Sequence, residues 1–374
     1  CMQIKDLFWC KNCLNMNTRP RITFDQHGWC NACQWMVKKK NLDWKKRKKE
    51  LLKLLDKFRS KNHQYDCVVP VSGGKDGSYI AYMLKHKYSM NPLCINIAPP
   101  LPLDLGSKNL ENFHQSGYDL LQLHLNTDLM SYLDRTGFIT MGSPYWGWMT
   151  AIHTAVIRTA VKFGLTLVFY GEDGEVEYGG SSETENTSLL SIEYQKKIWL
   201  ENGYKNIIKK VPKNLVKHID FWNYPSQKEL KKSPCYTTTM SYFEPWDSYR
   251  NYLIAKKHTG LEERQITSGG TFTNFAQNDQ KLYALHTYLM YLKFGFGRAT
   301  QDVGIEIRRG AMNRRQGLNL VNMYDNMYPQ EHKNSYCEYY KMSNTQFDKI
   351  IDKWANKNLF YKKKGRWFPR FKIV

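Results

Sequence analysis

Two adjacent glycines within residues 68–84, VVPVSGGKDGSYIAYML, separate a short apolar run from a segment with helical spacing. Residues 66–71 have the β-branched composition of a buried parallel strand, and apolar side chains recur at helical intervals from Ser78 onward. Glycine lets the backbone turn sharply and approach a ligand without an intervening Cβ. The N–H groups and the dipole of the following helix then favour an anion. The segment is therefore typical of a phosphate cradle, although glycines that serve only packing would give the same pattern.

The spacing of this turn excludes two common phosphate-binding motifs. The Walker pattern would need a glycine at position 69, which is valine, and a hydroxyl residue at position 76, which is aspartate. A dinucleotide-binding G-x-G-x-x-G turn fails because Lys75 stands at its second glycine. Residues 72–76, SGGKD, instead resemble the PP-loop, SGGxDS, of the ATP pyrophosphatases. The last Ser of that motif is Gly77 here, and Ser78 is a candidate to supply the missing hydroxyl.

Four of the nine cysteines form two Cys-x-x-Cys pairs, Cys10 with Cys13 and Cys30 with Cys33, separated by sixteen residues. Such pairs are typical of a Cys₄ zinc ribbon, in which four thiolates occupy the corners of a tetrahedron. Because a closed set of thiolates leaves no open position, we expect a structural Zn²⁺. Two reducible disulfides are the alternative, which a cytosolic compartment would disfavour.

The composition limits the compartment and the partners. No apolar run approaches membrane-spanning length, and the N-terminus lacks a signal-peptide layout, so we expect a cytoplasmic protein. The net charge is +21, from 55 Lys and Arg against 34 Asp and Glu, and many lysines lie in residues 38–40 and 45–49. Such a surface could bind nucleic acid, acidic lipid or a protein. The apolar stripe of residues 43–60 favours instead a helix whose lysines face solvent.

Short apolar runs alternate with helical segments, of which residues 146–163 are the clearest. The runs that we predict as strands are 66–71, 92–98, 118–125 and 166–171. This order predicts an α/β fold with a doubly wound parallel sheet, which binds ligands at the carboxyl ends of its strands. The predicted regions are a zinc ribbon (1–40), a basic connecting helix (41–62), an ATP-binding α/β domain with substrate loops (63–270) and a helical region that completes the site (271–374).

The whole chain resembles the N-acetyl sugar amidotransferases of bacterial surface-glycan biosynthesis, which belong to the PP-loop ATP pyrophosphatase superfamily. The resemblance includes the ribbon at 10–33 and SGGKDGS at 72–78, which recur in other families. Four later motifs are more specific. They are GEDGEVEYGG (171–180), SYFEPWDSYRNYLIAKK (241–257), GGTFTNFAQNDQK (269–281) and FGFGRATQDVGIEIR (294–308).

The resemblance implies an enzyme that converts the N-acetyl group of a nucleotide-activated sugar to an acetamidino group, as in pseudaminic acid, legionaminic acid and lipopolysaccharide sugars. Adenylation of the amide oxygen by ATP would create an AMP leaving group, which ammonia then displaces, so that AMP and PPi are released. The residues expected to bind ATP are Ser72, Gly73, Gly74, Gly77, Ser78 and Arg298. The residues expected to act in catalysis are Lys75, Asp76, Glu172 and Asp173.

Several of these roles have alternatives. Asp76, Glu172 and Asp173 could hold Mg²⁺, which prefers carboxylate and phosphate oxygens. Asp76 could instead only stabilise a helix start, and the other two could be solvated turn residues. Arg298 could contact a phosphate or a sugar carboxylate, or lie on the surface. The run at 179–182 could close over the sugar or serve as a linker.

A tRNA-thiolating PP-loop enzyme is the main alternative function, because that class also joins a Cys₄ ribbon to a PP-loop and the charge would suit RNA. Sulfur transfer typically needs further cysteines near ATP, whereas Cys67 and Cys94 fall inside predicted strands. We therefore expect no nucleic-acid partner.

The sequence also bears on the source of ammonia. No cysteine has the setting of a glutaminase nucleophile, and Cys1 lies too close to the ribbon to begin such a domain. Ammonia is therefore expected from outside, either free or from a partner. The resemblance implies a separate glutaminase and ammonia-channelling barrel pair.

Overall fold

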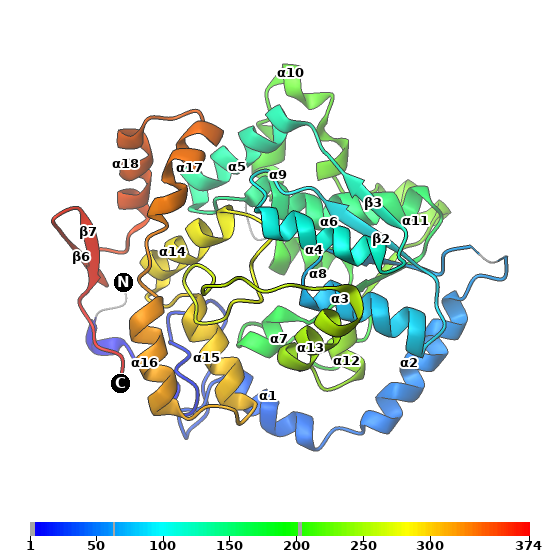
Figure 1. The fold of residues 1–374 in the computed structure, drawn as a ribbon, viewed down its shortest axis with the longest axis horizontal. Coiled ribbons are helices and arrows are strands. Elements are labelled where there is room, and N and C mark those ends of the chain that lie inside the picture. The colour runs from blue at the N-terminus through cyan, green and yellow to red at the C-terminus, as the bar shows by residue number, and fades with distance from the viewer. Residues whose placement is uncertain (1–3, 63, 201–203) are drawn as a thin grey trace.

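A five-stranded parallel sheet forms the centre of the computed structural model, which describes residues 4–62, 64–200 and 204–374 (Figure 1). Its strands are β1 (Cys67–Pro70), β2 (Pro92–Ile97), β3 (Leu120–Leu123), β4 (Leu167–Tyr170) and β5 (Tyr236–Thr239). They lie in the order β3-β2-β1-β4-β5, and each neighbouring pair is parallel. The predicted α/β fold is confirmed, and four strands fall within their predicted ranges. Cys1 lies outside the described residues.

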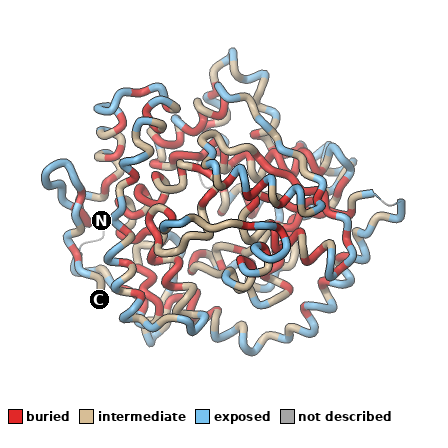
Figure 2. The backbone as a smooth tube through the Cα atoms, viewed as in Figure 1, coloured by how far each residue is buried: buried red, intermediate tan, exposed pale blue. Residues whose placement is uncertain are grey.

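Helices cover both faces of the sheet because successive strand residues point in opposite directions. Val68 faces the core that includes α6 (Trp146–Lys162), whereas Val69 faces the core that includes α3 (Lys75–Tyr82) and α4 (Asp104–Gln115). Strands β1, β2 and β4 are accordingly largely buried, whereas the edge strand β3 is only partly buried (Figure 2). Two more helices pack on these layers: α5 (Thr127–Met141) on α6, and α13 (Ser248–Thr259) on α3.

The N-terminal region, which contains the four paired cysteines, leads into α1 (Asn31–Lys40) and α2 (Trp44–Phe58). Helix α2 buries Arg47, Leu51 and Leu55 and packs on α12 (Met240–Phe243). The lysines at 45, 46, 48 and 49 are exposed, as the apolar stripe of the sequence indicates.

The fifth strand lies in the region 176–270, where the sequence shows no clear periodicity. Its sequence Tyr-Thr-Thr-Thr is short and polar, yet the three threonines are buried and the Thr238 hydroxyl donates to the Ser188 carbonyl at 2.6 Å. Short helices lie in the same region of the sequence. They are α7 (Gly174–Tyr178), α8 (Ile192–Tyr194), α9 (Tyr204–Lys209), α10 (Lys213–Val216) and α11 (Gln227–Lys232).

The C-terminal region contains helices and one hairpin. The helices are α14 (Leu282–Phe294), α15 (Arg298–Arg308), α16 (Arg314–Tyr324), α17 (Lys333–Tyr339) and α18 (Asn344–Trp354). The hairpin, β6 (Phe360–Lys363) with β7 (Arg366–Pro369), was not predicted. Both of its turn residues have positive φ, 48° at Lys364 and 79° at Gly365, as two-residue hairpin turns require. The hairpin follows α18 near the N-terminal segment in Figure 1.

Single-turn 3₁₀ and π segments complete the secondary structure. They are Ile4–Asp6, Met83–Lys87, Gln195–Trp199, Ile219–Trp222 and Gln330–His332. Among the helices of the described residues, none combines the length and the apolar character that a membrane span requires.

Candidate functional site

A cavity of about 220 Å³ opens at the carboxyl ends of β1 and β4, where the strand order reverses. Such a switch point is where open α/β sheets bind ligands. Residues 72–77 follow β1 and line the cavity, Glu172 follows β4, and Arg298 begins α15 on the C-terminal side. The structure thus brings together three predicted parts of the site that are far apart in the sequence.

Glycine stands at positions 73 and 74 of the PP-loop for two different structural reasons. Gly73 has φ +77°, and a Cβ there would lie 2.4 Å from the backbone nitrogen of Leu110. Gly74 has ordinary extended angles, φ −80° and ψ 176°, and caps α3. A Cβ on Gly74 would meet only the Ser72 hydroxyl, at 3.2 Å. The first turn of α3 therefore presents its N–H groups beside an open cavity, which suits an anion.

The departure from the usual PP-loop ending has a steric explanation. A Cβ on Gly77 would lie 2.7 Å from the Pro70 carbonyl oxygen, so a serine would not fit here without a shift of the backbone. Ser78 does not take its place. Its side chain is fully buried, does not line the cavity, and its hydroxyl has no hydrogen-bond partner within the protein. The cavity thus has no serine hydroxyl from position 77 or 78.

Lys75 and Asp76 form an ion pair at the edge of the cavity. The Lys75 Nζ lies 2.6 Å from the Asp76 Oδ2, and the Asn251 amide donates to the Asp76 Oδ1 at 3.3 Å. Burial lowers the pKa of Lys75, but the carboxylates of Asp76 and Glu172 outweigh this effect and raise the pKa above its ordinary value. Lys75 therefore carries a positive charge beside the helix start, where it can attract a phosphate.

The two adjacent acidic residues after β4 have different surroundings. Glu172 lines the cavity and accepts a hydrogen bond from the Tyr178 hydroxyl at 2.9 Å. Burial and the nearby Asp76 raise the pKa of Glu172. Asp173 does not line the cavity. It accepts hydrogen bonds from the Glu175 backbone N–H, at 3.1 Å, and from the Thr184 hydroxyl, and so caps α7. Its position indicates a structural role.

Arg298 is held on the opposite side of the cavity. Its Nε donates to the Asp302 Oδ1 at 2.8 Å, and its side chain is 18% exposed, so it is not a surface residue. Burial lowers the pKa of Arg298, but Asp302, Tyr178 and Glu172 together outweigh this effect and raise the pKa, so the guanidinium remains charged. Asp325 fixes the start of α15 by accepting hydrogen bonds from the Gly297 N–H, at 2.8 Å, and the Thr300 hydroxyl, at 2.5 Å.

The sequence did not assign roles to several residues that line the cavity. They are Gly106, Asn109, Tyr178, Leu261, residues 275–279 and Tyr283. The segment 275–279 belongs to the motif at 269–281, whose cluster of Asn, Gln and Asp after two glycines is a signal that could have been interpreted as a polar loop near a ligand. Gln277 has φ +57°, which is unusual for a residue with a side chain.

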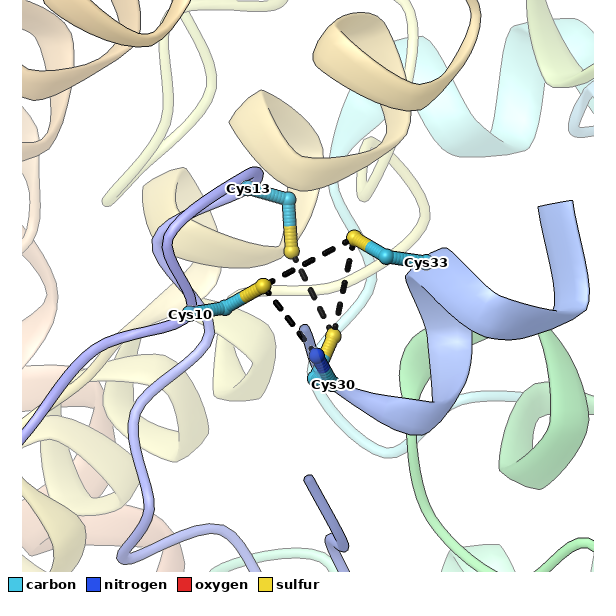
Figure 3. A group of neighbouring side chains, drawn as sticks. All are labelled: Cys10, Cys13, Cys30 and Cys33. Carbon is cyan, nitrogen blue, oxygen red and sulfur yellow. Dashed lines mark hydrogen bonds between the residues drawn. The ribbon is translucent and has the colours of Figure 1, made fainter. Parts of the chain in front are cut away.

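The four ribbon cysteines meet in one buried cluster, with their sulfur atoms pointing toward one another (Figure 3). The Sγ–Sγ distances are 3.8 Å for Cys10 and Cys33, 3.5 Å for Cys13 and Cys30, and 3.7 Å for Cys30 and Cys33. These distances are too long for disulfide bonds. Four thiolates about 2.3 Å from a tetrahedral zinc would lie about 3.8 Å apart. The cluster therefore fits one four-coordinate metal ion.

Donor groups around the cluster also favour thiolates. The Asn12 and Asn15 side-chain amides donate to the sulfurs of Cys33 and Cys30, at 3.3 Å and 3.4 Å. The Cys30 backbone N–H donates to the Cys10 sulfur at 3.2 Å. Such outer contacts orient metal ligands and stabilise their charge.

The ribbon is joined to the cavity through α7. Arg21 forms a bidentate ion pair with Glu175, at 2.8 Å and 2.7 Å. The Trp35 Nε1 and the Lys39 Nζ both contact the Glu177 carboxylate, at 2.9 Å and 2.7 Å. The same helix ends at Tyr178, whose ring lines the cavity.

The first residues of the Gly/Ser run at 179–182 pack on the ribbon. The Asn31 side-chain amide donates to the Gly180 carbonyl at 2.5 Å, and the Asn15 amide donates to the Tyr178 carbonyl at 3.1 Å. None of the residues 179–182 lines the cavity. The run therefore connects α7 to the ribbon in this structure.

The remaining cysteines do not contribute to the cavity. Within residues 4–62, 64–200 and 204–374, no cysteine lines it. Cys67 and Cys94 are fully buried in β1 and β2, as predicted, and burial raises the pKa of both thiols. Burial also raises the pKa of Cys235 to about 12.

One comparison with known proteins locates a match in the C-terminal part of the chain. Residues 269–373 match the family model described as LPS biosynthesis protein WbpG-like, C-terminal domain. A curated relative, an uncharacterized protein of Methanocaldococcus jannaschii, is 30% identical over 89 residues, or 24% of this chain. The matched segment spans 32% of that relative's length.

One solved structure is similar at a lower level. The U34-tRNA thiolase NcsA from Methanococcus maripaludis, solved with its 4Fe-4S cluster, is 14% identical, with 81% of this chain and 86% of that chain covered and a TM-score of 0.31. This likeness carries no conclusion about the reaction. The PP-loop at the switch point of the sheet and the match over residues 269–373 agree with the resemblance found in the sequence. Residues 269–373 are thus similar to the WbpG-like C-terminal domain of lipopolysaccharide biosynthesis proteins, and residues 72–76 are similar to a PP-loop.

Proposed function

We propose that this chain is an ATP-dependent amidotransferase that converts the N-acetyl group of a nucleotide-activated bacterial surface sugar to an acetamidino group. The observation that carries the proposal is the cavity in which the PP-loop meets Glu172 and Arg298. The WbpG-like match of residues 269–373 supports a sugar of the lipopolysaccharide type as the substrate.

ATP would bind with its β- and γ-phosphates at the start of α3. The backbone there approaches the ligand at Gly73 and Gly74, and Lys75 and Arg298 supply positive charge. Asp76 and Glu172 offer two carboxylates to the same cavity, a donor set that fits Mg²⁺ bound with phosphate oxygens. When bound, this ion would neutralise phosphate charge.

The reaction would follow from this placement. The amide oxygen of the acetamido group attacks the α-phosphorus of ATP, the new O–P bond forms, and PPi leaves. Ammonia then attacks the imidate carbon and the C–O bond to AMP breaks, so that the products are the amidine, AMP and PPi, with a proton released. A PP-loop suits this chemistry because it grips the departing pyrophosphate.

Thiolation of tRNA is the second candidate, and the structure gives it less support. Sulfur transfer would need a thiol near the activated substrate, but no cysteine of the described residues lines the cavity. We further propose that the ribbon holds a structural Zn²⁺, that the enzyme acts in the cytoplasm, and that a separate glutaminase and barrel pair supplies ammonia.

The products provide the direct test of the proposed function. The purified chain, incubated with ATP, Mg²⁺, an ammonium salt and nucleotide-activated diacetamido sugars, is expected to release AMP and PPi. The sugar should become about 1 Da lighter by mass, because a nitrogen with its hydrogen replaces an oxygen. Formation of ADP and phosphate, or no change in any sugar of the panel, would contradict the proposal.

The source of ammonia gives a separate prediction. With glutamine in place of ammonium, the chain alone is expected to give less than about one per cent of the ammonium-dependent rate, because it has no glutaminase nucleophile. Addition of the glutaminase partner should restore turnover. Glutamine-dependent turnover by this chain alone, lost on substitution of one of its own cysteines, would show the expectation to be wrong.

Glu172 and Asp173 are expected to differ although they are neighbours. Glu172→Ala should lower turnover at least about tenfold with little change in Tm, because its carboxylate lines the cavity. Asp173→Ala should cost about 1 kcal/mol of stability, because it removes the cap of α7. Thermal melts and turnover rates of the two variants check this assignment, which fails if Asp173→Ala is the variant with normal stability and lost turnover.

A further inference from the structure

Three neighbouring side chains beside the ATP cavity hold buried polar atoms without a hydrogen-bond partner within the protein. They are the Gln277 Oε1, the Asp279 Oδ2, and both amide atoms of Gln280. Gln280 is only 1% exposed. Asn278, in the same segment, is fully engaged, since it donates to the Asn274 carbonyl at 2.9 Å and accepts from the Ser268 hydroxyl at 3.1 Å.

These side chains lie between two hollows. Gln277 and Asp279 line the ATP cavity, and Gln280 lines a second hollow of about 10 Å³ beyond the loop, which also includes Arg264 and His332. Gln277 and Tyr283 line both hollows and so form their shared wall. A space of this size holds about one water-sized molecule. The loop therefore separates the ATP cavity from a small polar hollow by one layer of side chains.

Two of these side chains, Gln277 and Gln280, line the same small hollow and suit one small nitrogen ligand there. Burying polar groups without partners is costly, so such groups commonly receive a ligand or an ordered water. Ammonium has four N–H donors, and the small hollow is lined by two side chains with unpartnered oxygens, Gln277 and Gln280, whereas Asp279 lines the ATP cavity. Neutral ammonia has one lone pair, which the Gln280 Nε2 can meet as a donor. Gln277 also keeps a φ of +57°, a strained angle typical of functional loops.

We propose that the loop of residues 277–280 binds the ammonia that the proposed amidotransferase reaction consumes, and admits it to the ATP cavity from the side of Gln280. This inference rests on the proposed function. Burial raises the pKa of the Asp279 carboxyl to about 7, against the opposing effects of its own backbone N–H and of the Tyr283 hydroxyl. Lys75, Asp76, Glu172 and Arg298 are the other charged groups that line this cavity.

Gln280→Leu is the variant that tests the inference. It removes both amide atoms without loss of a hydrogen bond within the protein, so Tm should stay equal or rise. The KM for ammonium is expected to rise at least about tenfold, while the KM for ATP stays within about twofold. The matched control is Gln195→Leu, since Gln195 is equally buried but bonds Thr237 at 3.0 Å and Tyr224 at 3.1 Å. This control should lower Tm and leave the KM for ammonium unchanged.

A second variant covers the case in which Gln280→Leu does not fold. Gln277→Gly removes another acceptor and relieves the positive φ, so it should be at least as stable as the wild type and also raise the KM for ammonium. Binding can be measured without the sugar. Ammonium chloride should raise the Tm of the wild type more than sodium chloride at the same ionic strength, and this difference should disappear in either variant.

The outcomes separate the two proposals. If the wild type makes the amidine but both variants keep the wild-type KM for ammonium, the site is overturned and the proposed function stands. If the wild type shows no preferential stabilisation by ammonium, the site is also overturned. Absence of any ammonium-dependent product from the wild type, with normal ammonium binding, would overturn the proposed function alone.

Discussion

Gly74→Ala is expected to lower ATP-dependent turnover at least about a hundredfold, equivalent to about 2.7 kcal/mol, while the protein remains folded. The backbone of Gly74 has angles that alanine adopts without strain, and the new Cβ would meet only the Ser72 hydroxyl at 3.2 Å. The cost therefore falls on the ligand, because the methyl group stands where the phosphates approach the start of α3. ATP affinity, AMP formation and the thermal melt measure the three parts of this expectation.

The neighbouring glycine provides the contrast. Gly73→Ala places a Cβ 2.4 Å from the Leu110 nitrogen at a φ of +77°, so it should lower Tm strongly and lose turnover through misfolding. Gly74→Ala should lose turnover with a normal melt. Unchanged ATP affinity in Gly74→Ala would contradict the assignment of this turn as the phosphate cradle.

The parts of the site that the sequence could predict depend on local chain geometry. A strand, two glycines and a helix specify the glycine turn within residues 66–84, and the cysteine spacing specifies the four-cysteine cluster within 10–33. Arg298 was also singled out, because glycines flank it in a predicted turn, and the structure places it at the start of α15. Each of these signals lies within about twenty residues of sequence.

The remaining parts depend on contacts that no local pattern encodes. Glu172 and Asp173 are chemically similar neighbours, and only the turn after β4 decides that the first lines the cavity and the second caps α7. The burial of Ser78 follows from how α3 packs on the sheet. Strand β5 was not predicted because its sequence has no apolar pattern, although tertiary packing buries its threonines. The loop at 277–280 could not be identified from sequence, because only the structure shows which of its polar side chains lack hydrogen-bond partners.

Through its contacts with α7, the ribbon also affects the structure of the cavity. Glu175 and Glu177, which bind Arg21, Trp35 and Lys39, belong to the five-residue helix that also holds Tyr178. So short a helix is not stable by itself. The ribbon therefore supports one wall of the cavity that we propose to bind ATP, and loss of its proposed metal should affect this cavity from a distance.

Cys30→Ser is accordingly expected to remove the metal, lower Tm by at least about 5 °C and weaken ATP binding. Structural zinc contributes about 10–16 kcal/mol of binding free energy in small zinc domains, so loss of one thiolate is costly even when part of the ribbon remains packed. Metal analysis of the wild type should give one zinc per chain, and a chelator should reproduce the effect of the variant.

Cys337→Ser is the matched control, because Cys337 is buried but lies outside the ribbon. Its thiol forms a hydrogen bond with the Asn344 side chain at 3.5 Å. It should keep the full zinc content and nearly the wild-type ATP affinity. A wild type without zinc, or with an iron chromophore, would contradict the zinc assignment. A Cys30→Ser protein that loses its metal but keeps both Tm and ATP affinity would show that the metal-bound ribbon does not support the cavity. The ion pairs between the ribbon residues and α7 would then hold without the metal.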